Sequence, residues 1–257
     1  MTSSKLVIVF DYDWSLINTN SDIHVFEQLA PEVLKFISQK ANTEPDSWTS
    51  IIDQALVQMQ TNFSVSTDQI RECLAHVPVL AGMVAAVKEA AESGLAEVHI
   101  VSDASEFFIQ AFLDKKGLGQ YIKSVKTNAS WTCPEKGILR VRPYHPQEEP
   151  HGCSLCPPNL CKGRVLERDM GILGPESARI VYIGDGGGDF CAAVRLRPSD
   201  LLLVRNDPSV PSARGLVKRI EREKEQTPVS AEVREWTTGL QVLEAIREAI
   251  AIEAHKK

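Results

Sequence analysis

The chain has 257 residues, of which 43% are hydrophobic and 24% are charged. This composition is that of an ordinary globular protein, and it excludes a disordered chain, a collagen-like chain and a small disulfide scaffold. The length corresponds to one or two domains and suffices to bury a large core. The formal net charge of −6 disfavours a nucleic-acid partner, because proteins that bind nucleic acid usually carry a basic face.

No stretch approaches the roughly 18 apolar residues of a membrane span. The apolar run at residues 6–10 is also shorter than the core of a secretory signal, which needs about 7–15 residues. We therefore expect a soluble, cytoplasmic protein with no membrane partner and with reduced cysteines. The oligomeric state is left open by the sequence.

Short apolar runs alternate with helical patterns along most of the chain. The run at residues 6–10 predicts a strand that is buried on both faces, as in a parallel sheet. Between residues 21 and 76, apolar residues recur at helical spacing and strand-like runs are nearly absent. This segment is typical of an all-helical insert.

Beyond residue 76 the alternation of strands and helices resumes. Strands are predicted at 98–101, 124–127, 180–183 and 201–204, a hairpin or flap at 138–141, and helices at 83–93, 105–115, 163–170 and 240–254. The pattern favours an α/β fold with a Rossmann-like parallel sheet. Residues 1–20 and 77–257 would form the core, and residues 21–76 a helical cap inserted after the first strand.

Two pairs of carboxylates follow predicted strands. Asp11 and Asp13 come directly after the first strand, and Asp185 and Asp189 follow the strand at 180–183 in a glycine-rich turn. Such side chains converge when the two strands are neighbours in a parallel sheet. Four like charges need a counter-charge, and Mg²⁺ prefers oxygen ligands while leaving positions for water and phosphate. The alternative interpretation is that each aspartate caps the helix that follows it.

Other phosphate-binding motifs fit the sequence less well. The chain has no Gly-x4-Gly-Lys-Ser/Thr loop. The segment at 184–189 departs from the dinucleotide-binding pattern, because Asp189 occupies the position of its last glycine.

Four motifs, taken in chain order, resemble those of haloacid-dehalogenase-type phosphatases. They are Asp11-x-Asp13-x-Ser15, the strand end at Ser102, Lys162, and Gly184-Asp185-Gly-x-x-Asp189. The resemblance extends to the phosphoethanolamine/phosphocholine phosphatase family, whose relatives act on pyridoxal phosphate, thiamine monophosphate or pyrophosphate. The segments that carry this narrower match are Asn20-Ser21-Asp22, Ser102-Asp103-Ala104, Arg142-Pro143-Tyr144-His145, the loop from His151 to Lys162 and Gly184-Asp185-Gly-x-x-Asp189-Phe190-Cys191.

The resemblance implies a role for each motif residue. Asp11 would be the nucleophile that forms an aspartyl-phosphate, and Asp13 would protonate the leaving oxygen and later activate water. Ser102 and Lys162 would hold the phosphoryl oxygens. Mg²⁺ would be ligated by Asp11, by the backbone carbonyl of Asp13, by Asp185 and by Asp189, with the alternative that Asp189 only orients a ligand.

Two further aspartates flank these motifs. The family resemblance implies that Asp22 and Asp103 face the cationic head of an amine-bearing substrate, and a pair of carboxylates in a closed cleft does attract such a group. The alternative is helix capping, since residues 102–105 precede a predicted helix.

A cysteine-rich loop precedes Lys162. His151, Cys153, Cys156 and Cys161 lie within eleven residues, a spacing that could bind a structural Zn²⁺ and so fix Lys162. A tight buried loop and a redox-labile thiol cluster are the alternatives. The other cysteines, Cys73, Cys133 and Cys191, are distant in sequence and are expected to be packing residues.

Three hypotheses of function follow. The leading one is a Mg²⁺-dependent phosphomonoesterase that hydrolyses a small phosphorylated metabolite such as phosphoethanolamine or phosphocholine. The second has pyrophosphate, pyridoxal phosphate or thiamine monophosphate as its substrate. The third is a catalytically silent scaffold that binds phosphorylated ligands, and the presence of both Asp11 and Asp13 argues against it.

Overall fold

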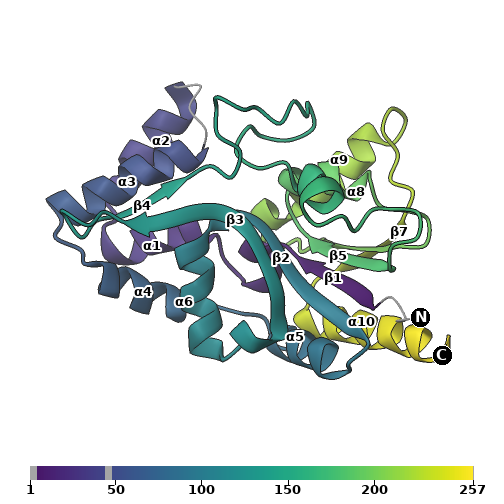
Figure 1. Cartoon of the computed structure of the whole chain (residues 1–257). Helices are drawn as coiled ribbons and strands as arrows, with labels where there is room; N and C mark the ends of the chain where they lie inside the picture. The colour runs from purple at the N-terminus through teal and green to yellow at the C-terminus, as the bar shows by residue number, and fades with distance from the viewer. Residues whose placement is uncertain (1–4, 44–47, 257) are drawn as a thin grey trace.

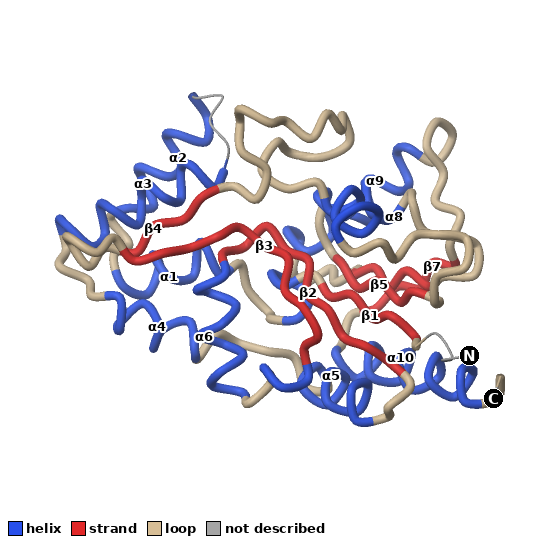
Figure 2. The backbone as a smooth tube through the Cα atoms, in the orientation of Figure 1, coloured by secondary structure: helices blue, strands red, loops and turns tan. Residues whose placement is uncertain are grey.

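The computed structural model describes residues 5–43 and 48–256. Residues 1–4, 44–47 and 257 of the predicted core and cap therefore lie outside the described residues. The described part contains one seven-stranded sheet with helices on both of its faces (Figures 1 and 2). The strands are β1 (Leu6–Phe10), β2 (Ala96–Ser105), β3 (Ile122–Thr132), β4 (Leu139–Arg142), β5 (Ile180–Gly184), β6 (Leu201–Arg205) and β7 (Glu232–Trp236).

Most of the helices follow the alternation that the sequence predicts, but those at residues 190–193 and 215–223 were not predicted. They are α1 (Ser21–Leu29), α2 (Val33–Thr43), α3 (Trp48–Asn62), α4 (Thr67–Ala75), α5 (Met83–Glu92), α6 (Glu106–Lys116), α7 (Lys162–Arg164), α8 (Phe190–Ala193), α9 (Gly215–Glu223) and α10 (Gly239–Ala254). The predicted helix at 163–170 is split into α7 and a π-helical turn at Val165–Asp169.

The strand order explains where a ligand can bind. It is β4-β3-β2-β1-β5-β6-β7, and every neighbouring pair is parallel except β3 and β4. From β1 the chain first builds β2 and β3 on one side, and then crosses to build β5, β6 and β7 on the other. Winding reverses between β1 and β5, and in such sheets the ligand crevice opens at the carboxyl ends of the strands at that point. The predicted parallel α/β fold is confirmed.

The central strand β1 is buried on both faces because its side chains alternate between two apolar layers. Leu6, Ile8 and Phe10 join the core that contains α5 and α10. Val7 and Val9 join a second core with residues of α8 and α9. Figure 2 shows these helices on opposite sides of the sheet. The buried, rigid strand thereby fixes the position of the carboxylates that follow it.

The sequence prediction missed the edge strand β7. Three of its residues, Glu232, Arg234 and Glu235, are charged, and only Trp236 is buried. Such a strand lacks the continuous apolar run that marks the central strands.

The four helices α1 to α4 follow β1, in the segment predicted to be a helical cap. These helices are in contact with the sheet, because α3 packs against the hairpin formed by β3 and β4 (Figure 1). Asp53 of α3 accepts hydrogen bonds from the Arg140 side chain at 2.6 and 2.8 Å and from the Val141 backbone at 2.9 Å. The division into core and cap stays a prediction, but these contacts tie the helices to the sheet.

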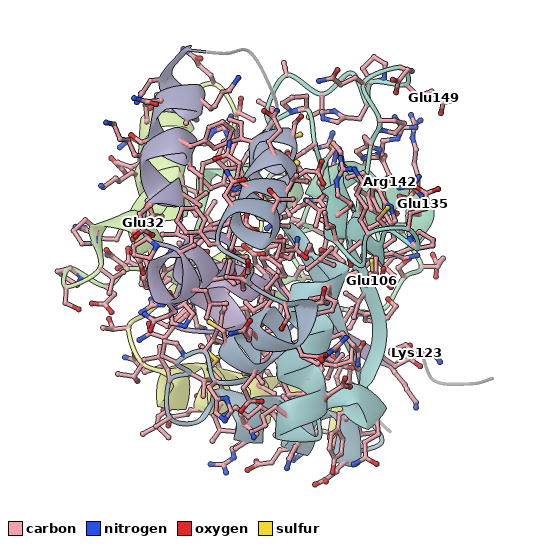
Figure 3. All side chains as sticks on the ribbon, turned by 90° about the vertical axis from the view of Figure 1, so that its left-hand side faces the viewer. Glu32, Glu106, Lys123, Glu135, Arg142 and Glu149 are labelled. Carbon is pink, nitrogen blue, oxygen red and sulfur yellow. The ribbon has the colours of Figure 1, made fainter. Side chains whose placement is uncertain are left out.

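The face formed by α1 to α4 and the β3–β4 hairpin carries charges of both signs. Figure 3 shows this side of the molecule, and the six charged residues labelled in it, Glu32, Glu106, Lys123, Glu135, Arg142 and Glu149, are all exposed. No helix within residues 5–43 and 48–256 has the length and apolar character needed to cross a membrane.

Candidate active site

A cleft of about 260 Å³ opens at the carboxyl ends of the central strands. Seven of the eight predicted catalytic, substrate-binding and magnesium residues line it: Asp11, Asp13, Asp22, Asp103, Lys162, Asp185 and Asp189. Ser102 is not among the described lining residues. It is fully buried, and its Oγ accepts a hydrogen bond from the backbone of Ala104 at 3.3 Å.

The loop after β1, at Tyr12–Leu16, is an irregular turn in which Asp13 and Trp14 have non-helical backbone angles, and neighbouring residues hold it in place. The Asp11 backbone N–H donates to the carbonyl of Ile183 on β5 at 2.9 Å, which joins the two strand ends. Ser15 donates to Asp185 Oδ1 at 3.2 Å, so the first and last motifs are also joined through side chains. Trp14 has a φ of 56°, in the left-handed region that non-glycine residues rarely adopt.

Lys162 lies at the centre of the acidic cluster. Its Nζ is 2.8 Å from Asp11 Oδ2 and 2.7 Å from Asp189 Oδ1, and its side chain is only 3% exposed. Asp11 Oδ1 accepts the backbone N–H of Tyr12 at 2.7 Å. The lysine therefore fixes the direction in which the Asp11 carboxylate points.

Asp189 uses both of its carboxylate oxygens inside the protein. Oδ1 accepts from Lys162 and from the Tyr182 hydroxyl, each at 2.7 Å. Oδ2 accepts from the backbone N–H groups of Asp185 at 3.2 Å and Gly186 at 3.0 Å. Four donors on one fully buried carboxylate suit a residue that positions Lys162, and this favours the orienting alternative for Asp189.

The cluster carries more negative than positive charge. Burial, followed by the charge of Asp189, raises the pKa of Asp11 well above its usual value, although Lys162 opposes the shift. Burial and then Asp11 and Asp189 likewise raise the pKa of Asp185. The ligand atoms of Asp11, Asp185 and Asp189 lie within 4.8 Å of one another. Buried carboxylates with this excess of charge fit a divalent cation that prefers oxygen ligands, as Mg²⁺ does.

Asp13 is positioned by the start of α1. Its Oδ1 accepts the backbone N–H of Ser21 at 3.0 Å. Burial, followed by the charge of Asp22, raises the pKa of Asp13 well above its usual range. A carboxyl group with a raised pKa can hold a proton near neutral pH, which is what a general acid requires.

Asp22 and Asp103 place further negative charge along the same cleft. The indole N–H of Trp48 donates to Asp22 Oδ2 at 2.6 Å. Burial raises the pKa of Asp22 to about 7, while this hydrogen bond opposes the shift. The capping alternative does not describe these residues, because Asn20 caps α1 and the N-cap of α6 is Ser105.

The sequence prediction missed Arg205, which supports the loop after β1. This fully buried residue donates from Nη1 to the carbonyl of Trp14 and from Nη2 to Asn18 Oδ1, both at 2.7 Å. Its guanidinium also lies 5.7 Å and 5.3 Å from the ring centroids of Trp14 and Trp236. Arg205 could have been predicted from its place directly after the apolar run at 201–204. Asp11 was identified in the same way, as a charged residue directly after the apolar run of β1.

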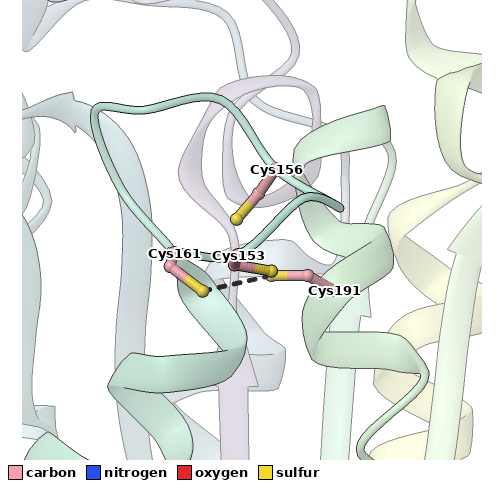
Figure 4. A group of neighbouring side chains, drawn as sticks. All are labelled: Cys153, Cys156, Cys161 and Cys191. Atoms are coloured by element: carbon pink, nitrogen blue, oxygen red, sulfur yellow. Dashed lines mark hydrogen bonds between the residues drawn. The ribbon is translucent and has the colours of Figure 1, made fainter. Parts of the chain in front are cut away.

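The cysteine loop meets a fourth cysteine in the structure. Cys153, Cys156 and Cys161 meet Cys191 of α8, and their four sulfur atoms lie within 4.8 Å of one another (Figure 4). The expectation that Cys191 lies apart is wrong, because α7 packs directly against α8. His151 is not part of this sulfur group, and its Nε2 lies 2.9 Å from the carbonyl of Pro157 while its Nδ1 accepts the Cys153 N–H at 3.0 Å.

Comparison with known proteins gives consistent matches over nearly the whole chain. The model of the family described as Putative Phosphatase matches residues 6–250. A thiamine phosphate phosphatase-like protein of Arabidopsis thaliana is 34% identical over 92% of this chain and 91% of its own length. Inorganic pyrophosphatase 2 of the same plant is 32% identical, over 92% of this chain and 81% of its own.

A more distant relative and a solved structure extend this picture. The pyridoxal phosphate phosphatase PHOSPHO2 of Bos taurus is 28% identical over 93% of this chain and 96% of its own. A phospho-aspartyl intermediate analogue of phosphoserine phosphatase superposes with a TM-score of 0.58 at 15% identity, over 95% of this chain and 99% of that one. At 15% identity this superposition shows a shared fold and nothing about activity.

Proposed function

This chain belongs to the Putative Phosphatase family, and from that premise we propose that it is a Mg²⁺-dependent phosphomonoesterase with Asp11 as its nucleophile. At the level of the family it is a haloacid-dehalogenase-type phosphatase that acts on small phosphorylated metabolites. The observation that carries the assignment of the nucleophile is the buried contact of Lys162 with both Asp11 and Asp189. This contact with Lys162 holds the Asp11 carboxylate in one orientation at the carboxyl end of β1.

The reaction has two steps. In the first, a carboxylate oxygen of Asp11 attacks phosphorus, the bond from phosphorus to the leaving oxygen breaks, and Asp13 gives its proton to that oxygen. In the second, Asp13 takes a proton from water as the water oxygen attacks phosphorus. The aspartyl-phosphate bond breaks, and Asp11 and inorganic phosphate are released.

Lys162 acts in both steps through its charge. Its ammonium group favours the ionised form of Asp11 and can also pair with an oxygen of the phosphoryl group. When bound, Mg²⁺ would be held by Asp11, Asp185 and the backbone carbonyl of Asp13, and would offset the charge of the phosphoryl group. Asp189 keeps Lys162 in place.

The acidic lining of the cleft favours a substrate with a cationic head. Asp22 and Asp103 supply negative charge, and Trp14 and Trp48 line the same cleft. Carboxylates and aromatic faces both attract ammonium groups. A volume of about 260 Å³ lies below that of pockets for drug-sized ligands, so it suits a small metabolite. Phosphoethanolamine and phosphocholine meet both conditions.

A second candidate is a phosphorylated vitamin or pyrophosphate. Thiamine monophosphate is supported by the name of the relative that is 34% identical, and it too carries a positive charge. Pyrophosphate is supported by the name of another relative, but Asp22 and Asp103 would repel it.

The direct test is phosphate release from phosphoethanolamine, phosphocholine, thiamine monophosphate, pyridoxal phosphate and pyrophosphate in the presence of Mg²⁺. We expect activity in the wild type and none in Asp11→Asn, which is nearly isosteric but cannot form the acyl phosphate. Release that persists in Asp11→Asn would contradict the assignment of the nucleophile. The absence of release from all five compounds would favour the phospho-ligand-binding scaffold or an untested substrate.

The head-group assignment has a separate test in Asp22→Asn and Asp103→Asn. Each substitution should raise KM for phosphocholine and leave KM for pyrophosphate unchanged or lower, because each removes one negative charge. An equal rise in KM for both substrates would contradict recognition of a cation.

A further inference from the structure

Four of the six cysteines meet at one point, although they come from two separate segments of the chain. Cys153 and Cys156 lie in the loop before α7, Cys161 is the N-cap residue of α7, and Cys191 lies in α8. All are free thiols, and Cys161 and Cys191 are fully buried. Figure 4 shows the four side chains pointing toward a common centre.

The spacing of the sulfur atoms matches a tetrahedral thiolate site. Four thiolates at about 2.3 Å from a Zn²⁺ ion stand about 3.8 Å from one another, which is the edge of the corresponding tetrahedron. The sulfur atoms of Cys161 and Cys191 are 3.8 Å apart, and all four lie within 4.8 Å of one another. Cys153 and Cys156 also have the Cys-x2-Cys spacing common among zinc ligands.

The surroundings supply donors for negatively charged sulfur. The backbone N–H of Gly163 lies 3.2 Å from Cys191 Sγ, and that of Arg164 lies 3.4 Å from Cys161 Sγ. Arg195 donates to the carbonyl of Cys191 at 2.6 Å, and its side chain interacts with Cys153. Zinc with four thiolates carries two net negative charges, and a cation and two N–H groups beside the sulfur atoms offset that charge.

We infer that Cys153, Cys156, Cys161 and Cys191 bind one structural Zn²⁺ ion, which clamps the cysteine loop and α7 onto α8. This metal site lies next to Lys162 and Asp189 in the sequence. Cys161 precedes Lys162, and Cys191 follows Asp189 by two residues. A β-carbon added at Gly163 would lie 2.5 Å from the carbonyl of Cys191, which shows how closely the two helices approach. The ion therefore holds both partners of the Lys162–Asp189 pair.

The metal content of the full-length protein, purified with a reductant and without a chelator, tests this inference directly. Elemental mass spectrometry should find about one zinc per chain, and metal-free protein that takes up Co²⁺ should show the absorption bands of a tetrahedral tetrathiolate. A strong chelator should lower the unfolding temperature. These readouts do not depend on catalysis, so they remain valid if the proposed reaction fails.

Three variants locate the ligands. Cys153→Ser should lose zinc, whereas Cys133→Ser, a control outside the cluster, and His151→Ala should keep it. Should Cys153→Ser fail to fold, the Co²⁺ spectrum of the wild type still reports the number of thiolate ligands. Less than about 0.2 zinc per chain together with no Co²⁺ spectrum would overturn the inference. So would iron in place of zinc, a disulfide among the four cysteines, or loss of zinc in His151→Ala.

Discussion

The hydroxyl of Tyr182 stabilises the charged cluster. The loss of unfolding free energy on its removal follows from the contact that it makes in the structure. Tyr182 lies on β5, is fully buried, and donates to Asp189 Oδ1 at 2.7 Å. Burial, followed by the charge of Asp189, raises the pKa of this tyrosine, so the hydroxyl keeps its proton and remains a donor at neutral pH. The substitution Tyr182→Phe removes this one hydrogen bond and keeps the aromatic ring.

A hydrogen bond to a charged acceptor contributes about 1.5–3 kcal/mol to stability. We therefore expect Tyr182→Phe to lower the free energy of unfolding by about 2 kcal/mol. With a urea m-value of about 3 kcal/mol/M, the midpoint of unfolding would fall by about 0.5–1 M and the slope would not change. We also expect kcat to fall roughly tenfold, which corresponds to about 1.4 kcal/mol of lost positioning of Asp189 and Lys162.

Tyr12→Phe is the matched control for stability. Tyr12 is also fully buried, but its hydroxyl lies 3.4 Å from the neutral carbonyl of Phe108. This distance exceeds that of a normal O–H···O hydrogen bond, so we expect a loss below about 0.5 kcal/mol. Urea unfolding of both variants and the wild type should be measured in excess EDTA, so that bound metal adds nothing to stability. The reasoning is refuted if Tyr182→Phe costs no more than Tyr12→Phe.

Three other predictions concern the surroundings of the cleft. Arg205→Lys should lower kcat roughly tenfold without changing the order of substrate preference, because it loses the two hydrogen bonds that hold the loop after β1; an unchanged kcat would contradict this. Asp53→Asn should cost about 1 kcal/mol in urea unfolding, because it weakens the paired contact with Arg140, and a loss below about 0.2 kcal/mol would argue against it. Since the pKa of Asp22 is raised to about 7, protonation below that pH removes its charge. KM for phosphocholine should therefore rise between about pH 8 and pH 6, and Asp22→Asn should abolish that dependence.

Much of the fold and of the cleft follows from local sequence patterns. The continuous apolar run of β1 predicts a strand with both faces buried, since a strand in the middle of a doubly wound sheet contacts helices on each side. Asp11, Asp13 and Asp185 are recognisable because charged residues directly after buried strands stand at the edge of the sheet where ligands bind. Asp189 was identified in the same way, from the glycine-rich turn after the strand at 180–183, whereas Lys162 was found through the resemblance of its motif.

Other features depend on neighbours that are distant in sequence. Arg205 reaches Trp14 only because β5 and β6 follow β1 in the sheet. No local pattern encodes that strand order. Cys191 completes the group of thiols because α8 packs on α7, whereas sequence proximity favoured His151. The sequence by itself thus determined the fold class and the charged residues at the strand ends. The tertiary structure decided which side chains orient them, because a hydrogen bond needs contact in space and not proximity along the chain.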